Sequence, residues 1–154
     1  MHFRIRGLPA EPFADLFNLS DAELAQRFAV RRRVDADHGY PCRISLTDAK
    51  VGDEVILVNH EHLDVATPYR SRHAIYVRQG EVRFDAVDTV PDMLRRRLLS
   101  LRGFDADGMM TSADVVEGRD LETAIARQLA DPQTRYLHAH IARPGCYAAY
   151  IERA

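Results

Sequence analysis

Alternation of apolar and polar residues predicts several β-strands along the chain. The segment FRIRGL alternates Phe3 and Ile5 with two arginines and ends at Gly7. Two further β-rich runs, VILVNHEHL at residues 55–63 and HAIYVR at residues 73–78, have a similar character. Because successive side chains of a strand point to opposite faces, each run predicts a strand with one buried side.

Two other segments show the signals of amphipathic helices. Ser20 and Glu23 stand three positions apart, as in a capping box, and predict a helix over residues 20–28. The segment RDLETAIARQLADP repeats apolar residues at i, i+4 and i+8 and is stopped by Pro132, which predicts a helix over residues 119–130.

The segment that begins at Pro91 predicts a short helix and then a β-hairpin. Its first strand is expected near residues 98–104, and the DADG sequence at residues 105–108 follows it. A calcium loop beginning at Asp105 would need glycine and an oxygen ligand where this chain has Met110 and Val116. We therefore interpret DADG as a hairpin turn.

Together these elements predict an α+β fold. We expect a single domain over residues 1–154, with a mainly antiparallel sheet, two or three helices and a C-terminal β-hairpin. A chain of 154 residues buries enough surface to fold without disulfides or metals. No linker or internal repeat divides it.

The net charge and the lengths of the apolar runs argue against nucleic-acid and membrane partners. A net charge of −2 lacks the basic excess typical of proteins that neutralise phosphates, so no nucleic-acid partner is expected. Arginine triplets at residues 31–33 and 95–97 are interpreted as solvated faces, because neither a strand nor a helix gathers three successive side chains. No apolar run is long enough for a membrane span, and no membrane partner is expected.

The chain is expected to act in the cytoplasm. Its start, MHFRIRGLPAEPF, carries charges where a signal peptide needs an apolar region. Its two cysteines, Cys42 and Cys146, are far apart in the sequence, and in a reducing compartment we expect free thiols.

The C-terminal segment YLHAHIARPGCYAAY holds the most concentrated chemistry. If its two strands pair across a three-residue loop of Arg143, Pro144 and Gly145, one face of the hairpin is apolar. The other face then carries polar and sulfur side chains: Tyr136, His138, His140, Cys146, Tyr150 and Glu152. A four-residue loop would shift the parity and turn the cysteine to the core face.

In the three-residue register His140 and Cys146 are diagonal neighbours within side-chain reach. This placement makes Cys146 a candidate catalytic nucleophile and His140 its candidate base. The competing interpretation is structural, since histidine on a sheet face and buried cysteine commonly serve only in packing.

Other residues are candidates for binding a ligand. His60 and His62 form a second pair spaced like His138 and His140, and two such pairs on strands can supply metal ligands. The loop TPYRSR offers Tyr69 and Arg70, which suit a carboxylate or another anion.

Arg43 is a further candidate for binding an anion, and it can also act on the thiol of Cys42 if the two are held close. Adjacent strand positions point apart, however, and a buried Cys42 is the competing interpretation. No phosphate loop, CxxC or HExxH motif is present, so the cofactor, if any, is unknown.

Several segments resemble an uncharacterised bacterial family of about this length, a domain of unknown function. They are FRIRGLPAEPF, YPCRISLTDA, GDEVILVNHEH, PYRS and HAHIARPGCYAAYIERA. The family is associated with asparagine after the second histidine of the last motif, where this chain has Ile141. The resemblance runs nearly end to end and implies a single domain, but it implies no activity.

These observations predict a small binding module whose pocket recognises a small anionic ligand or a metal. The ligand-binding candidates are Arg43, His62, Tyr69, Arg70 and His138. One alternative is a thiol-dependent enzyme built on Cys146 and His140, and another is an inert structural or interaction protein. A homodimer is a further hypothesis, because strand edges need cover.

Overall fold

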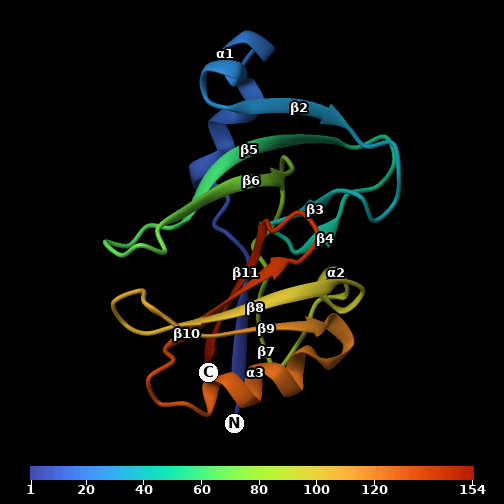
Figure 1. The fold of residues 1–154 in the computed structure, drawn as a ribbon. Helices are drawn as coiled ribbons and strands as arrows, with labels where there is room; N and C mark the ends of the chain where they lie inside the picture. Colours follow the sequence, from blue (N-terminus) through green and yellow to red (C-terminus); the bar gives the residue numbers. More distant parts are fainter.

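A computed structural model describes all of residues 1–154. It contains two β-sheets, each with a helix on its outer side (Figure 1). The six-stranded sheet has the order β7-β1-β11-β10-β8-β9 and comprises β1 (Phe3–Arg6), β7 (Asp85–Val87), β8 (Leu98–Phe104), β9 (Met110–Glu117), β10 (Tyr136–Ile141) and β11 (Tyr147–Arg153). The five-stranded sheet has the order β2-β5-β6-β3-β4 and comprises β2 (Ala29–Arg33), β3 (Pro41–Cys42), β4 (Thr47–Asp48), β5 (Glu54–Leu63) and β6 (Ser71–Val77).

The fold is α+β, as the sequence predicts. Every strand pairing is antiparallel except that of β3 with β6. The helices are α1 (Asp21–Gln26), α2 (Asp92–Arg95), α3 (Leu121–Leu129) and the 3-10 helices η1 (Glu11–Asn18) and η2 (Gly118–Asp120). The capping box of α1 is present, with Ser20 accepting from the Glu23 backbone and Glu23 from the Ser20 backbone.

The predicted helices and hairpins are present, and α3 begins two residues after its expected start. The sequence signals did not predict helix η1. It buries Phe13 and Leu16 against the five-stranded sheet. Arginines 95, 96 and 97 each pair with a different carboxylate, those of Glu122, Asp92 and Asp48, so this triplet forms no common patch.

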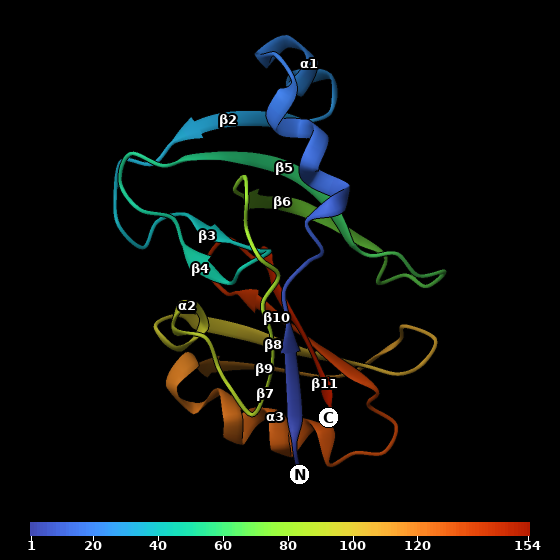
Figure 2. The ribbon, with the colours of Figure 1, turned by 180° about the vertical axis from the view of Figure 1, so that it is seen from behind.

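Two large apolar cores form the outer layers, and a third, smaller cluster comprises Val34, Cys42, Ala49 and Val55. The larger core lies between the six-stranded sheet and helices α2 and α3, and the smaller one between the five-stranded sheet and helices η1 and α1. Figures 1 and 2 show α1 and α3 at opposite ends of the molecule, with both sheets between them. The inner faces of the two sheets therefore meet in the middle of the molecule.

The chain crosses from one sheet to the other directly after β1. Gly7 donates its backbone N–H to the Phe84 carbonyl, and Leu8 donates to the Arg43 carbonyl. A Cβ atom on Gly7 would lie 2.0 Å from the carbonyl oxygen of Ile44, so this crossing needs glycine. The two termini lie at one end of the molecule because β1 and β11 are neighbours (Figure 2).

The terminal hairpin has the predicted register only in its first half. Tyr136 pairs with Glu152, and His138 with Tyr150, but His140 pairs with Tyr147 instead of Ala148. A β-bulge leaves Ala148 without a partner, and a four-residue loop replaces the expected three-residue one. The last part of the predicted register is therefore wrong.

No helix of the chain combines the length and apolarity needed to span a bilayer.

Candidate functional site

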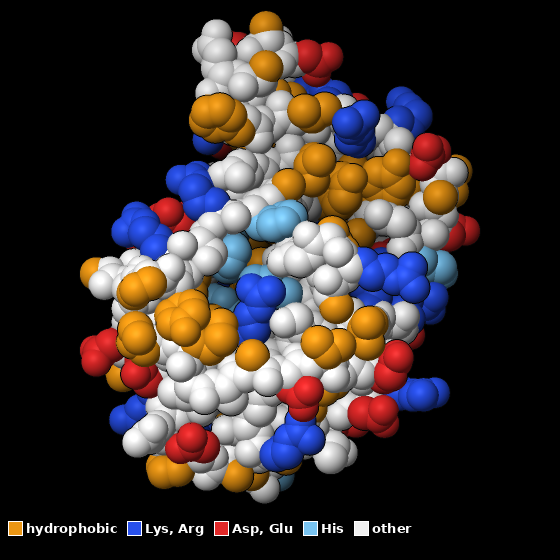
Figure 3. All heavy atoms as spheres, viewed as in Figure 1, with side chains coloured by type: hydrophobic (Ala, Val, Ile, Leu, Met, Phe, Trp, Pro, Cys, Tyr) orange, Lys and Arg blue, Asp and Glu red, His pale blue; other side chains and the backbone are white.

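Three histidines from the two sheets meet in the middle layer. His138 and His140 are on β10, and His62 reaches them from the end of β5. The ring centroid of His62 lies 5.0 Å from that of His140 and 6.1 Å from that of His138, while His138 and His140 are 6.2 Å apart. In Figure 3 histidine side chains gather in a hollow between the sheets, with arginine beside them.

A β-bulge brings His62 into this group. The pairing of β5 with β6 shifts between Glu61 and Leu63, which turns His62 toward the other sheet. His60 instead packs against Phe13 below helix η1, with ring centroids 5.5 Å apart. His60 and His62, which the sequence grouped as a pair of candidate metal ligands, point to different sides of the sheet, because the bulge interrupts the alternation.

Tyr147 takes the place that the sequence assigned to Cys146. Its ring lies 5.0–5.9 Å from the rings of His62, His138 and His140, and it stacks on His62. Cys146 belongs instead to the apolar core of the six-stranded sheet. The predicted placement of Cys146 beside His140 is wrong, because the bulge and the longer loop change the parity of this strand end.

The cluster contains polar atoms that no protein group satisfies. The chain has four buried side-chain nitrogen atoms without a hydrogen-bond partner: Arg6 Nε, His62 Nδ1, His138 Nδ1 and His140 Nε2. A buried polar group left unpaired costs about 1–3 kcal/mol, so such groups are rare outside functional sites. The three imidazoles and Arg6 together hold all four of these nitrogens.

Burial keeps the imidazoles neutral. Burial, together with charge repulsion from His140, His62 and Arg102, lowers the pKa of His138 to about 3. Burial also lowers the pKa of His140 to about 3 and that of His62 to about 4. His140 Nδ1 donates to the Gly145 carbonyl at 3.0 Å, so in the neutral ring Nε2 carries a free lone pair.

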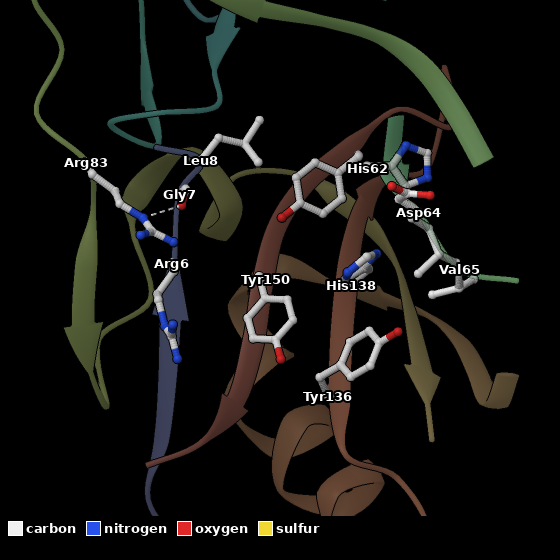
Figure 4. A pocket seen from close by; sticks show the side chains of 12 residues that line it. Arg6, Gly7, Leu8, His62, Asp64, Val65, Arg83, Tyr136, His138 and Tyr150 are labelled. Atoms are coloured by element: carbon white, nitrogen blue, oxygen red, sulfur yellow. Dashed lines mark hydrogen bonds between the residues drawn. The ribbon is translucent and has the colours of Figure 1, made fainter. Parts of the chain in front are cut away.

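A cavity of about 380 Å³ opens beside the cluster. Figure 4 shows Arg6 and Arg83 on one side of it and His62 and His138 on the other, with the Tyr150 ring between them. Tyr136 and Tyr150 stack on each other along its wall, with centroids 5.3 Å apart, and burial raises the pKa of both phenols. The tyrosines therefore stay protonated and able to donate.

Of the arginines in and beside the cavity, Arg83 and Arg102 have no carboxylate partner, whereas Arg6 pairs with Glu152. Arg83 donates Nε to the Gly7 carbonyl at 2.8 Å and has no carboxylate partner. Arg6 pairs with Glu152 through Nη2, which leaves its buried Nε free. Arg102 lies opposite His138 across the strands, contacts only Ser100 by hydrogen bonding, and has its pKa lowered by burial.

The structure separates the other predicted ligand-binding residues from this cavity. Arg70 is exposed and pairs with Glu61 and Asp64, so its charge is already neutralised. Tyr69 packs its ring edge-on against Phe104 instead of lining the cavity. Arg43 is buried behind Tyr147, where it donates Nε to the Tyr147 carbonyl at 2.8 Å. Of the predicted residues, the cavity wall includes His62 and His138.

Sequence reasoning missed Arg6, Arg83 and Tyr147 as site residues. Arg6 had one available signal, since it alternates with the apolar side of β1. Arg83 lies outside any strand, and its approach to the cavity depends on the distant Gly7 carbonyl. The position of Tyr147 at the site could be predicted only if the bulge in β11 were known.

No group of three or more histidine, cysteine, aspartate or glutamate side chains is arranged to hold a metal ion. The three imidazoles are neighbours, Arg6 and Arg83 line the cavity beside them, and the one carboxylate in the cavity wall, that of Asp64, pairs with Arg70. With two arginines and one carboxylate in its wall, the cavity favours an anion over a cation.

The architecture is that of an α+β domain with a polar cavity between two sheets. Residues 39–153 match the family model described as "Protein of unknown function (DUF1203)", and the chain belongs to this family. No curated protein and no solved structure matches the chain.

Proposed function

We propose that the protein binds a small hydroxylated organic acid in the cavity between its sheets. The observation that carries this proposal is the concentration of all four unpartnered buried nitrogens on Arg6, His62, His138 and His140. The arginine groups offer positive charge, and the neutral imidazoles offer acceptors for hydroxyl groups.

The arrangement of the wall favours a ligand with two kinds of group. Arg6 and Arg83 supply guanidinium donors on one side, which suits a carboxylate. The imidazoles of His62 and His138 face it from the other side, and they accept hydrogen bonds only if the ligand carries donors. The cavity volume of about 380 Å³ suits a metabolite of a few carbon atoms.

We further propose a reducing compartment, the cytoplasm, as the place of action. Both cysteines are free and buried in the folded chain, so the fold uses no disulfide.

The proposal is tested by calorimetry with three compounds of similar size. Gluconate carries both the charge and the hydroxyls, hexanoate carries only the charge, and sorbitol carries only the hydroxyls. We expect gluconate to bind at least tenfold more tightly than either of the others, because the arginine end contributes about 1.5–3 kcal/mol per charged hydrogen bond and the imidazole end about 0.5–1.5 kcal/mol per neutral one.

Variants identify the site. Arg83→Gln removes the charge but keeps a donor for the Gly7 carbonyl, and we expect it to weaken gluconate binding about tenfold. Arg119→Gln is the matched control, because Arg119 is exposed on η2 and pairs only with Asp120. Equal affinities in the two variants, or no affinity for any acid, would reject the anion site. A metal that co-purifies with the wild type but not with His138→Leu would show that the cavity is a metal site and not an anion site.

A further inference from the structure

A second cavity, of about 360 Å³, lies at the start of β11 and shares no lining residue with the first. Its wall includes Arg43, His73, Tyr76, Ile141 and Cys146. It is separated from the first cavity by the backbone of residues 146–147, since Tyr147 lines the first and Cys146 the second.

Arg43 is the most deeply buried charged residue of the chain, with 1% of its surface exposed. Its guanidinium donates to two backbone carbonyls, those of Tyr147 and Pro41, and through Nη2 to Cys146 Sγ at 2.9 Å. It pairs with no carboxylate. Burial lowers the pKa of Arg43, but a guanidinium stays protonated in proteins.

A buried cation needs a nearby negative charge, because an unpaired buried charge costs several kcal/mol. The two carbonyl partners of Arg43 are neutral. Cys146 is the one group hydrogen-bonded to Arg43 that can become an anion. The need for an anion thus comes from the arginine, independently of any property of the cysteine.

We propose that Cys146 is a thiolate that balances the charge of Arg43, and that it reacts with small uncharged electrophiles, including peroxides, that enter the second cavity. Cys146 lines this cavity, so its sulfur has a route to small reagents although the side chain is largely buried. The sequence suggested His140 as the group that supports Cys146. In this proposal Arg43 has that role instead.

The chemistry balances without any further reactant. With a peroxide, the thiolate sulfur attacks one oxygen, the O–O bond breaks, and hydroxide leaves, giving a sulfenic acid. The sulfur is oxidised and the peroxide is reduced. With iodoacetamide, a sulfur–carbon bond forms and iodide leaves.

Cys42 provides an internal contrast. It is fully buried, does not line the second cavity, and donates weakly to the Tyr40 carbonyl at 3.6 Å. Burial and the neighbouring Glu81 raise the pKa of Cys42 to about 12. It is therefore expected to stay a thiol and to resist alkylation.

The experiment measures alkylation by iodoacetamide with intact mass spectrometry. The variant Cys42→Ala leaves Cys146 as the single thiol, and Cys146→Ala leaves Cys42. Between about pH 6 and pH 8 we expect the Cys146 rate to change less than twofold, while thiols of the urea-denatured chain react roughly tenfold faster per pH unit. At neutral pH Cys146 should react at least tenfold faster than Cys42.

Arg43→Gln is expected to slow the labelling of Cys146 at neutral pH at least tenfold, and Arg43→Lys to restore part of the rate. If Arg43→Gln fails to fold, the pH profile of the folded Cys42→Ala protein decides the matter alone. A rate that rises with pH as in the denatured chain would overturn the proposal. Absence of labelling at all pH values would overturn it as well.

Discussion

Neutral histidines make the middle layer sensitive to acid. In the unfolded chain a histidine takes up its proton near pH 6.5, whereas folded His138 and His140 do so near pH 3. Between these values the unfolded state binds more protons, so the free energy of unfolding falls as the pH falls. Above about pH 6.5 both histidines are neutral in the folded and the unfolded chain, and their protonation does not affect stability. Below about pH 6.5 their protonation in the unfolded chain lowers the free energy of unfolding.

We predict that His138→Leu reduces this acid sensitivity. Well below pH 6.5 each buried neutral histidine removes up to about 1.4 kcal/mol of stability per pH unit. Between about pH 6 and pH 5, the variant should therefore lose about 1 kcal/mol less than the wild type. Urea unfolding at the two pH values measures this difference.

His38→Asn is the matched control for this prediction. His38 is exposed and has a φ of 60°, which asparagine tolerates. A reduced acid sensitivity in His138→Leu but not in His38→Asn assigns the effect to the buried ring. An unchanged slope in His138→Leu would show that His138 is already charged in the folded protein.

At the level of single elements, the connection between the two sheets after β1 leaves no space for a side chain at position 7. Gly7 lies against backbone, because its hypothetical Cβ would be 2.0 Å from Ile44 O and 2.9 Å from Arg43 O. Backbone atoms cannot turn aside as a flexible side chain does. A side chain at position 7 would therefore push β1 away from the five-stranded sheet.

We predict that Gly7→Ala lowers the free energy of unfolding by about 3 kcal/mol or more, the range of severe overpacking. Gly39→Ala serves as the control, since its Cβ would meet only one atom, 3.8 Å away. Chemical denaturation of both variants measures the difference. Equal stabilities would mean that the crossing moves apart at little cost.

Local sequence signals predicted those elements whose stabilising contacts are local. The capping box of Ser20 and Glu23 and the stop at Pro132 lie within a few residues of the helices they define. The two β-bulges have no comparable signal. The bulge near His62 depends on pairing with β6, and the bulge at Ala148 accompanies a loop one residue longer than expected.

These bulges determined which of the predicted site residues lie together. His138 and His140 share a face because simple alternation holds along β10. Cys146 follows the bulged strand end, and a shift of one residue moved it to the other face. The sequence therefore predicted the histidine pair correctly but could not identify the partner of the cysteine.

At the scale of the whole molecule, the division into two sheets escaped prediction because it rests on pairing between distant segments. Strand β1 pairs with β11 and β7, and no local pattern specifies these partners. The arrangement leaves the two large apolar cores with a polar layer between them. That layer holds the unpartnered nitrogens because neither core can enclose them.

This arrangement predicts how a bound acid affects the two sheets. The cavity wall combines Arg6, His138 and Tyr150 of the six-stranded sheet with His62 and Leu63 of the five-stranded sheet. A ligand that contacts both sides stabilises the molecule only while the sheets stay together, so its binding energy opposes their separation. Saturating gluconate should therefore slow hydrogen exchange at the end of β5 and along β10 alike.

Hydrogen exchange followed by mass spectrometry checks this expectation, with β9 as an internal reference. Strand β9 is the outer edge of the six-stranded sheet and contributes no residue to the cavity wall. We expect little change there and at least a threefold slowing in peptides covering residues 60–66 and 136–141. Protection confined to one of these peptides would show that the ligand binds one sheet alone. At a gluconate concentration near the wild-type Kd, the Arg83→Gln variant should lose most of the protection in both peptides, because tenfold weaker binding leaves its site only roughly one-tenth occupied.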